Sequence, residues 1–253
     1  MKNQADQRLV NGVTENVSHA WYEGETTLHR WKGETNPHYS GFQDDGKYTW
    51  VKSPRFEGHP MQIGALAQAL IGYAQGHKLT YKWAGEGINR VSAISRKQVT
   101  PAMLHSTLGR IAARAIRASM LADLANKHWD LLVENIASGH TKLYVKPQFG
   151  EKELHGVGFH EVPRGTLSHW VVIKDGQIAN YQAVVPTTWN AGPRDEHGSP
   201  GPYEASLLGN PVAEAQRPLE VLRTVHSFDP CLACAIQTFD PEGREVITVS
   251  EKG

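Results

Sequence analysis

The sequence predicts an α+β fold, with long packed core helices in the middle of the chain and short strands and hairpins in its C-terminal half. Two observations support this prediction. Apolar residues recur at helical spacing between residues 100 and 138, as expected for helices that bury one face. After Gly156, short runs of alternating apolar and polar residues are separated by turn signals. At 253 residues the chain could form one large domain or two small ones.

Composition and charge exclude several classes of partner. The chain has 26 Lys and Arg against 26 Asp and Glu, so its formal net charge is zero. This balance argues against nucleic acid as a partner. The longest apolar stretch, Ile63–Ala74, is too short and too interrupted by Gly and Gln to cross a bilayer. Residues 1–6 show no apolar region of the kind that a signal peptide needs.

The first part of the chain has little regular pattern. Residues 1–60 show neither helical nor strand period, and we expect an irregular segment that packs on a partner protein. Within it, Tyr48–Gly58 is a short strand-like run that we expect to stop at Pro54. Met61–Gly76 is apolar and rich in alanine, which predicts a closely packed helix that breaks at Gly76.

The strongest helix signal runs from Thr100 to Ala125, with Thr100 as the N-cap and Pro101 in the first turn. A second helix is predicted over Lys127–Ser138, and Gly139 is expected to stop it. We expect the apolar stripes of both helices to lie in the core: Leu104, Leu108, Ile111, Ala112, Ala115, Ile116 and Met120 in the first, and Leu131, Leu132 and Ile136 in the second.

The C-terminal half predicts shorter elements. Thr166–Asp175 and Ile178–Val185 are expected to pair as a hairpin that turns at Asp175-Gly176. The remaining elements are expected in this order: a loop over Ala191–Pro202, an amphipathic helix over Leu219–Phe228, a turn over Asp240–Gly243 and a strand over Val246–Val249.

Both cysteines of the chain lie in one short element, Asp229-Pro230-Cys231-Leu232-Ala233-Cys234. Two thiolates at this spacing can converge on one soft metal ion. The pair alone is also compatible with a redox dithiol or with two small buried apolar residues. A redox dithiol normally opens a helix, whereas here a predicted helix precedes Cys231. A four-ligand site would need two further ligands, either non-sulfur ones or ligands from another chain.

Five stretches follow one another in this order: Lys52–Gly58, His105–Arg110, Glu161–Trp170, Val185–Asn190 and Asp229–Cys234. Together they resemble, in sequence and in order, the large subunit of nickel–iron hydrogenases. The resemblance extends from about residue 45 to the end, and its character is that of the membrane-associated respiratory uptake enzymes. It implies that residues 1–253 are a C-terminal portion of the hydrogenase large-subunit fold.

The resemblance also implies roles for individual residues. Cys231 would be a terminal nickel ligand, and Cys234 would bridge nickel to an iron that carries cyanide and carbonyl ligands. Soft thiolates suit both metals. Arg164 would be a catalytic residue with its guanidinium above the open coordination position, and Asp229 would pair with Arg164 or order the loop. Without the resemblance, we would interpret Arg164 as part of an ordinary surface salt bridge, and Asp229 could equally be a turn or cap residue.

Three further positions follow from the same resemblance. Pro186 and Thr187 would contact the cyanide ligands through backbone and hydroxyl groups. Gln237 stands where the family usually has His, at the maturation cleavage position and close to a structural magnesium, which its carbonyl oxygen could still contact. Residues 238–253 resemble the extension that a maturation peptidase removes after nickel is loaded.

The family's N-terminal half, with a second CxxC pair and a glutamate proton acceptor, has no counterpart in these residues. We therefore expect a fragment or one half of a split catalytic subunit, which oxidises H2 heterolytically once it is joined to its complementary half. The implied partners are that half, an iron–sulfur small subunit, cytochrome b and a maturation peptidase. The implied location is the periplasmic face of a membrane, reached through the partner's signal. The alternatives are a truncated non-catalytic remnant, a metal-binding or assembly module and, more weakly, a dithiol oxidoreductase.

Overall fold

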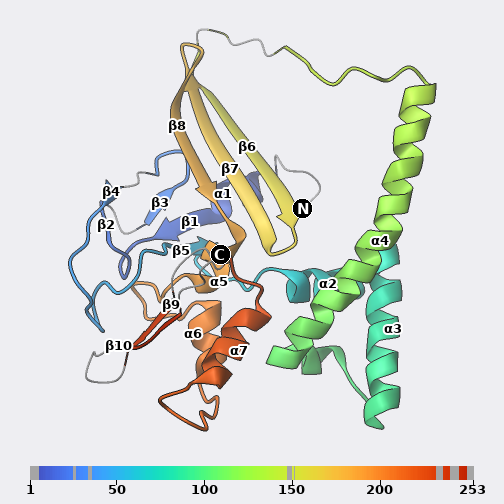
Figure 1. The fold of residues 1–253 in the computed structure, drawn as a ribbon. Coiled ribbons are helices and arrows are strands. Elements are labelled where there is room, and N and C mark those ends of the chain that lie inside the picture. The colour runs from blue at the N-terminus through green and yellow to red at the C-terminus, as the bar shows by residue number, and fades with distance from the viewer. Residues whose placement is uncertain are drawn as a thin grey trace.

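A computed structural model describes residues 6–24, 27–33, 36–146, 150, 152–231, 236–239 and 245–249. The predicted α+β class is confirmed. Figure 1 shows a group of helices on one side of the molecule, a long three-stranded sheet in the middle and smaller elements on the other side. Among the described helices, none is both long and apolar enough to cross a membrane.

The expectation that residues 1–60 are irregular is wrong in part. After helix α1 (Gln7–Gly12), strand β1 (Val13–Asn16) pairs antiparallel with β3 (Thr27–His29) on one side and β5 (Ser53–Phe56) on the other. These strands have three or four residues each, which is too short to show a period of two. The pairing of β1 with β5 joins segments that are distant in sequence, so local pattern could not reveal it.

The expected stop at Pro54 is also wrong, because β5 continues through this residue, which pairs with Glu15. β5 is an edge strand, and an edge strand tolerates a proline that donates no hydrogen bond. A second small sheet joins β2 (Tyr22–Glu23) to β4 (Asn36–Pro37).

Buried charges hide the strand pattern of β1. The carboxylate of Glu15 is buried, accepts a hydrogen bond from Arg30 and lies 3.6 Å from the ammonium nitrogen of Lys52. Burial lowers the pKa of both Arg30 and Lys52, while Glu15 opposes that change. A charged residue at an interior position breaks the alternation on which strand prediction relies.

The helical part contains α2 (Ala65–Ala74), α3 (Lys78–Ser95), a 3₁₀ turn (Pro101–Leu104) and α4 (Thr107–Ala137). The predicted break after Ala125 is wrong, because α4 is one helix of 31 residues. Its N-cap is Ser106 rather than Thr100, since the Ser106 hydroxyl accepts from the backbone N–H of Gly109 at 3.1 Å. α3 was not predicted, whereas the helix that stops at Gly76 is confirmed by the positive φ of 66° there.

The expectation that the whole α4 stripe is core is wrong for most of its length. Leu104 and Ile116 are buried, but Leu108 is 77% exposed and Ile111, Leu131, Leu132 and Ile136 are exposed as well. Figure 1 shows the reason: α2 and α3 lie beside the first half of α4, and the second half stands clear of the other described elements. The helical core consists of Ala65, Leu66, Ala69, Ala84, Leu104, Ala113 and Ile116.

The central sheet has the order β6-β7-β8, with β6 at Leu154–Val162, β7 at Gly165–Lys174 and β8 at Gln177–Val184. The predicted hairpin between β7 and β8 is confirmed, and both turn residues, Asp175 and Gly176, have positive φ. β6 was not predicted. This sheet contributes to a second core, which contains Val10, Val13, Trp170, Val184 and Trp189.

The C-terminal part contains the short helices α5 (Pro186–Ala191) and α6 (Pro202–Leu207), then α7 (Leu219–Ser227) and a hairpin of β9 (Ile236–Phe239) and β10 (Glu245–Val249). The predicted loop before α6, the final helix and the last strand are confirmed. The predicted turn at residues 240–243 lies outside the described residues.

Candidate metal centre

The first cysteine follows the C-terminal end of α7. The backbone N–H of Asp229 donates to the carbonyl of His226 at 3.0 Å, and Asp229 itself adopts a left-handed φ of 59°. Aspartate tolerates this conformation better than most residues. The turn ends the helix and directs the chain to Pro230 and Cys231, whose thiol is free and whose residue is exposed. Cys234 lies outside the described residues.

Thr187 is brought directly to this cysteine. Its hydroxyl accepts a hydrogen bond from the backbone N–H of Cys231 at 3.2 Å. Thr187 lies in the first turn of α5, where Pro186 occupies the initial position that suits proline. The side chain of Asn190 holds α5 in place, because it bonds both the N–H and the carbonyl of Ile63 at 3.1 Å each. Sequence alone could not show that Thr187 and Cys231 meet.

Asp229 lies between two guanidinium groups. Its carboxylate is 3.9 Å from Nε of Arg164, in the turn between β6 and β7, and 3.4 Å from an Nη atom of Arg114, on α4. All three side chains are about one third to one half exposed, so each pair contributes little to stability. The predicted contact between Arg164 and Asp229 is present, although its distance of 3.9 Å is longer than a hydrogen bond. Arg114 was not predicted, and it is the closer of the two.

Arg110 lines the same small pocket as Arg114 and Asp229 and is largely buried. Its guanidinium carbon is 3.9 Å from the ring centroid of Phe228, and it donates to the hydroxyl of Ser227 at 3.4 Å. Burial lowers the pKa of Arg110. Arg110 and Arg114 are four residues apart in a helical pattern, so they share one face of α4. That spacing was the signal in the sequence from which both could have been found.

The site thus combines one thiol, one hydroxyl, one carboxylate and three guanidinium groups. They belong to Cys231, Thr187, Asp229, Arg164, Arg114 and Arg110. This excess of positive charge suits an anionic metal–thiolate cluster. Within the part of the chain that the structure describes, no group of three or more His, Cys, Asp or Glu could hold a metal ion. The donors fit one side of a soft-metal site, and a complete ligand set needs further donors. A helix precedes Cys231, which disagrees with a thioredoxin-type dithiol.

Gln237 lies in β9, where it pairs with Thr248 of β10. The predicted cleavage position is thus inside a paired strand.

Comparison with known proteins gives a consistent result. The family model for nickel-dependent hydrogenase matches residues 2–237. The Hydrogenase-2 large chain of Escherichia coli K12 is 47% identical over 246 residues, covering 97% of this chain and 43% of that protein. The quinone-reactive Ni/Fe-hydrogenase large chain of Wolinella succinogenes is 40% identical, covering 92% of this chain and 43% of that protein. The uptake hydrogenase large subunit of Bradyrhizobium diazoefficiens is 43% identical, with 96% and 43% covered.

Solved structures agree. The [NiFeSe]-hydrogenase of Desulfomicrobium baculatum has a TM-score of 0.70 at 32% identity, covering 89% of this chain and 44% of that one. The chain spans less than half the length of the curated relatives that it matches.

Proposed function

Because this chain belongs to the nickel-dependent hydrogenase family, we propose that it supplies the C-terminal portion of a hydrogenase catalytic subunit that oxidises H2. The observation that carries the proposal is the meeting of Cys231, Thr187, Asp229 and Arg164, which come from three separate stretches of sequence. These are the residues to which the sequence resemblance assigns the metal centre. Residues 1–253 would form one unit within the complete subunit.

Cys231 and Cys234 would hold nickel and an iron that carries cyanide and carbonyl ligands. When bound, that centre supplies the heterolytic cleavage of H2 and the redox change. Thr187 would fix the loop that carries Cys231, since its hydroxyl already bonds that residue's backbone. Pro186 and Thr187 would present backbone and hydroxyl groups to the cyanide ligands.

Arg164 and Asp229 would act on the open side of the centre. The guanidinium of Arg164 is only loosely held by Asp229 at 3.9 Å, so it can reorient toward a bound group. Asp229 is also held from α4 by Arg114. Asp229 would therefore keep the Arg164 guanidinium close to the metals held by the cysteine loop. The positive charges of Arg164 and Arg114 would stabilise the anionic cluster.

The complete enzyme would include further partners. Electrons would leave through an iron–sulfur small subunit, and the complementary N-terminal portion would supply the remaining thiolates. A cytochrome b would be a further partner, and the complex would be membrane-associated at the periplasmic face. The name of the Wolinella relative, quinone-reactive, supports the membrane association. Gln237 would mark the maturation position with a nearby magnesium ion, and a peptidase would remove residues 238–253. This cleavage would take away β10 and the second half of β9.

The test is to purify the chain with its associated proteins from the native host, and to measure nickel, iron, intact mass and H2-dependent dye reduction. We expect about one nickel and one iron per chain, and a mass that lacks residues 238–253. Cys231→Ser should lose nickel and activity, whereas Glu196→Gln, at an exposed residue that pairs with the neighbouring His197, should keep both.

A second candidate is a non-catalytic metal-binding or assembly module, which is favoured by Gln237 in place of the usual His. A full-length mass without nickel or iron in the wild-type complex would contradict the first candidate and support a non-catalytic assembly role.

A further inference from the structure

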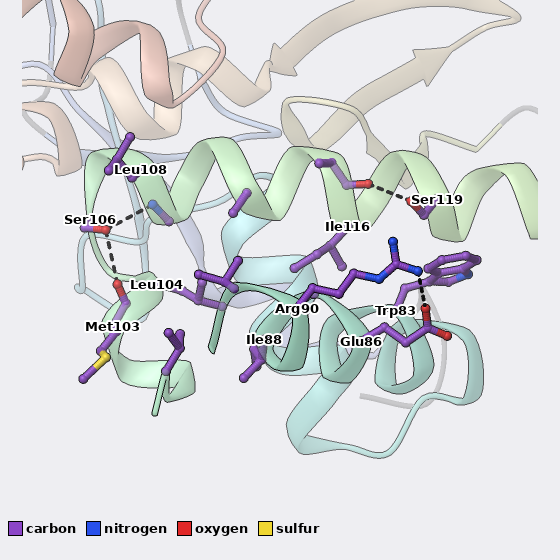
Figure 2. Close-up of a pocket in the computed structure, with 16 residues that line it drawn as sticks. Trp83, Glu86, Ile88, Arg90, Met103, Leu104, Ser106, Leu108, Ile116 and Ser119 are labelled. Carbon is purple, nitrogen blue, oxygen red and sulfur yellow. Dashed lines mark hydrogen bonds and ion pairs between the residues drawn. The ribbon is translucent and has the colours of Figure 1, made fainter. Parts of the chain in front are cut away.

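The first half of α4 gives Arg114 a rigid support. Figure 2 shows the N-cap bond of Ser106 at the start of this helix and the side chain of Ile116 pointing from α4 toward α3. Ala113 and Ile116, on either side of Arg114 in the sequence, are buried in the helical core. Because core residues are closely packed, the backbone that carries the Arg114 guanidinium has little freedom to move.

A series of polar contacts fixes the end of α7 against the same helix. Three contacts are present: Thr107 with Thr224 (3.3 Å between hydroxyls), Arg110 with Ser227 (3.4 Å) and Arg114 with Asp229 (3.4 Å). The three residues of α4 are separated by three and four positions, so they share one face of the helix. This face therefore sets the position of Asp229, at the turn that directs the chain to Cys231.

Arg164 has a fixed backbone but a loosely held side chain. A Cβ atom added at Gly165 would lie 2.6 Å from Ile63 Cδ1, and one added at Gly64 would lie 3.0 Å from the carbonyl oxygen of Arg164. The turn between β6 and β7 is thus in close backbone contact with the segment before α2. The side chain of Arg164, in contrast, is 45% exposed, and its ion pair with Asp229 spans 3.9 Å.

Asp229 divides its two carboxylate oxygens between two guanidinium groups. Oδ1 lies 3.4 Å from Nη1 of Arg114, and Oδ2 lies 3.9 Å from Nε of Arg164. A carboxylate and a single guanidinium usually form two parallel hydrogen bonds of about 2.7–2.9 Å. Asp229 does not form this arrangement with Arg164, because Arg114 holds one of its oxygens toward α4.

We propose that Arg114 is a positioning residue of the candidate metal centre: it holds Asp229 toward α4 and so keeps the guanidinium of Arg164 from closing on this carboxylate. This inference deepens the proposed function and rests on it. A guanidinium that is not closed on a carboxylate keeps its N–H donors and its charge available on the open side of the centre.

Removal of Arg114 should let Arg164 close on Asp229. Both oxygens of the carboxylate could then accept from Arg164, which would lose its availability to a bound group. Arg110 cannot take the place of Arg114, because its guanidinium lies on the ring of Phe228 and donates to Ser227.

The test compares variants of the chain in the complex purified with its associated proteins from the native host. In Arg114→Gln we expect the nickel content of the wild type, a KM for H2 within about twofold and a kcat about 10- to 100-fold lower. A crystal structure of this complex should place Nε of Arg164 within about 3.0 Å of the Asp229 carboxylate. Arg114→Lys should keep most of the activity, because Arg114 contacts one oxygen and a point charge can do the same.

The double variant Arg114→Gln/Asp229→Asn separates positioning from a merely structural role. If Arg114 acts through Asp229, the double variant has the kcat of Asp229→Asn alone, whereas independent roles would multiply the two losses. The matched control is Arg90→Gln on α3, which removes a guanidinium whose ion pair with Glu86 has a similar length of 3.5 Å (Figure 2). It should leave kcat, KM and nickel content unchanged.

Four results would overturn the inference: an Arg164–Asp229 distance that stays near 3.9 Å in Arg114→Gln, multiplied losses in the double variant, an Arg114→Lys variant as slow as Arg114→Gln, or loss of nickel in Arg114→Gln but not in Arg90→Gln. A wild-type complex that has no nickel and oxidises no H2 would instead contradict the proposed function. In that complex, a shorter Arg164–Asp229 distance in Arg114→Gln would still support the positioning role, and an unchanged distance would overturn it.

Discussion

Substitution Arg55→Met tests the buried ion pair that ties β5 to the loop after α5. Nε of Arg55 donates to the carboxylate of Asp195 at 2.9 Å, although the two residues are 140 positions apart. Each residue is only 3% exposed. The same guanidinium also donates to the carbonyls of Pro54 and Ser199 at 2.9 Å each. The pair therefore connects the N-terminal sheet to the segment that precedes α6.

We expect Arg55→Met to lower the free energy of unfolding by about 3–5 kcal/mol, because it leaves the Asp195 carboxylate buried without its counterion. The double variant Arg55→Met/Asp195→Asn should recover a substantial part of this loss, because a neutral amide can keep the hydrogen bonds that Asp195 accepts from the backbone N–H groups of His197 and Ser199, 3.0 Å each. Urea denaturation followed by circular dichroism measures both variants.

Arg8→Met is the control, because Arg8 pairs with Glu57 next to the same strand but at an exposed site. It should change the unfolding midpoint far less than Arg55→Met. The reasoning is refuted if Arg55→Met costs less than about 1 kcal/mol, or if the double variant loses the sum of the two single losses.

The same pair predicts a dependence on pH. Burial raises the pKa of Asp195, but the hydrogen bonds from Arg55 and from the backbone of Ser199 and His197 outweigh it, so the folded-state pKa lies below the ordinary value. The stability from this group is present above the unfolded pKa of about 3.9, and it is lost as pH falls through the lower folded pKa. In Arg55→Met the main lowering contact is gone, so acid unfolding should begin at higher pH. An unchanged acid midpoint would contradict the assignment.

Two further substitutions test the candidate site. Gly165→Ala should destabilise the chain by about 1–3 kcal/mol, because φ is 129° and a Cβ atom would lie 2.6 Å from Ile63 Cδ1; Gly176→Ala, where no atom lies within 4 Å, should cost less. Equal losses in thermal unfolding would show that the contact with Ile63 is unimportant. Thr187→Val should lower the nickel content of the purified complex, because it removes the acceptor of the Cys231 N–H. Thr187→Ser should keep the metal, and loss in both variants would refute a role for the hydroxyl.

Local patterns determined much of this structure. Asp175 and Gly176 specify the β7–β8 turn, since both adopt positive φ there. Gly76 ends the preceding helix for the same reason, and the amphipathic run before Cys231 forms α7. The cysteine element and four other stretches also carry the family resemblance. Each of these signals lies within a few neighbouring residues, so no knowledge of the chain's path is required.

The remaining features of the structure depend on contacts between residues that are far apart in the sequence. The Cys231–Thr187 hydrogen bond joins residues 44 apart, and the Arg55–Asp195 pair joins residues 140 apart. Arg114 reaches Asp229 only because α4 lies against α7. The apolar stripe of α4 follows helical spacing along its entire length, but spacing cannot say what covers it. Burial is a property of the packed neighbours, and among the residues that the structure describes, only those along the first half of α4 supply them.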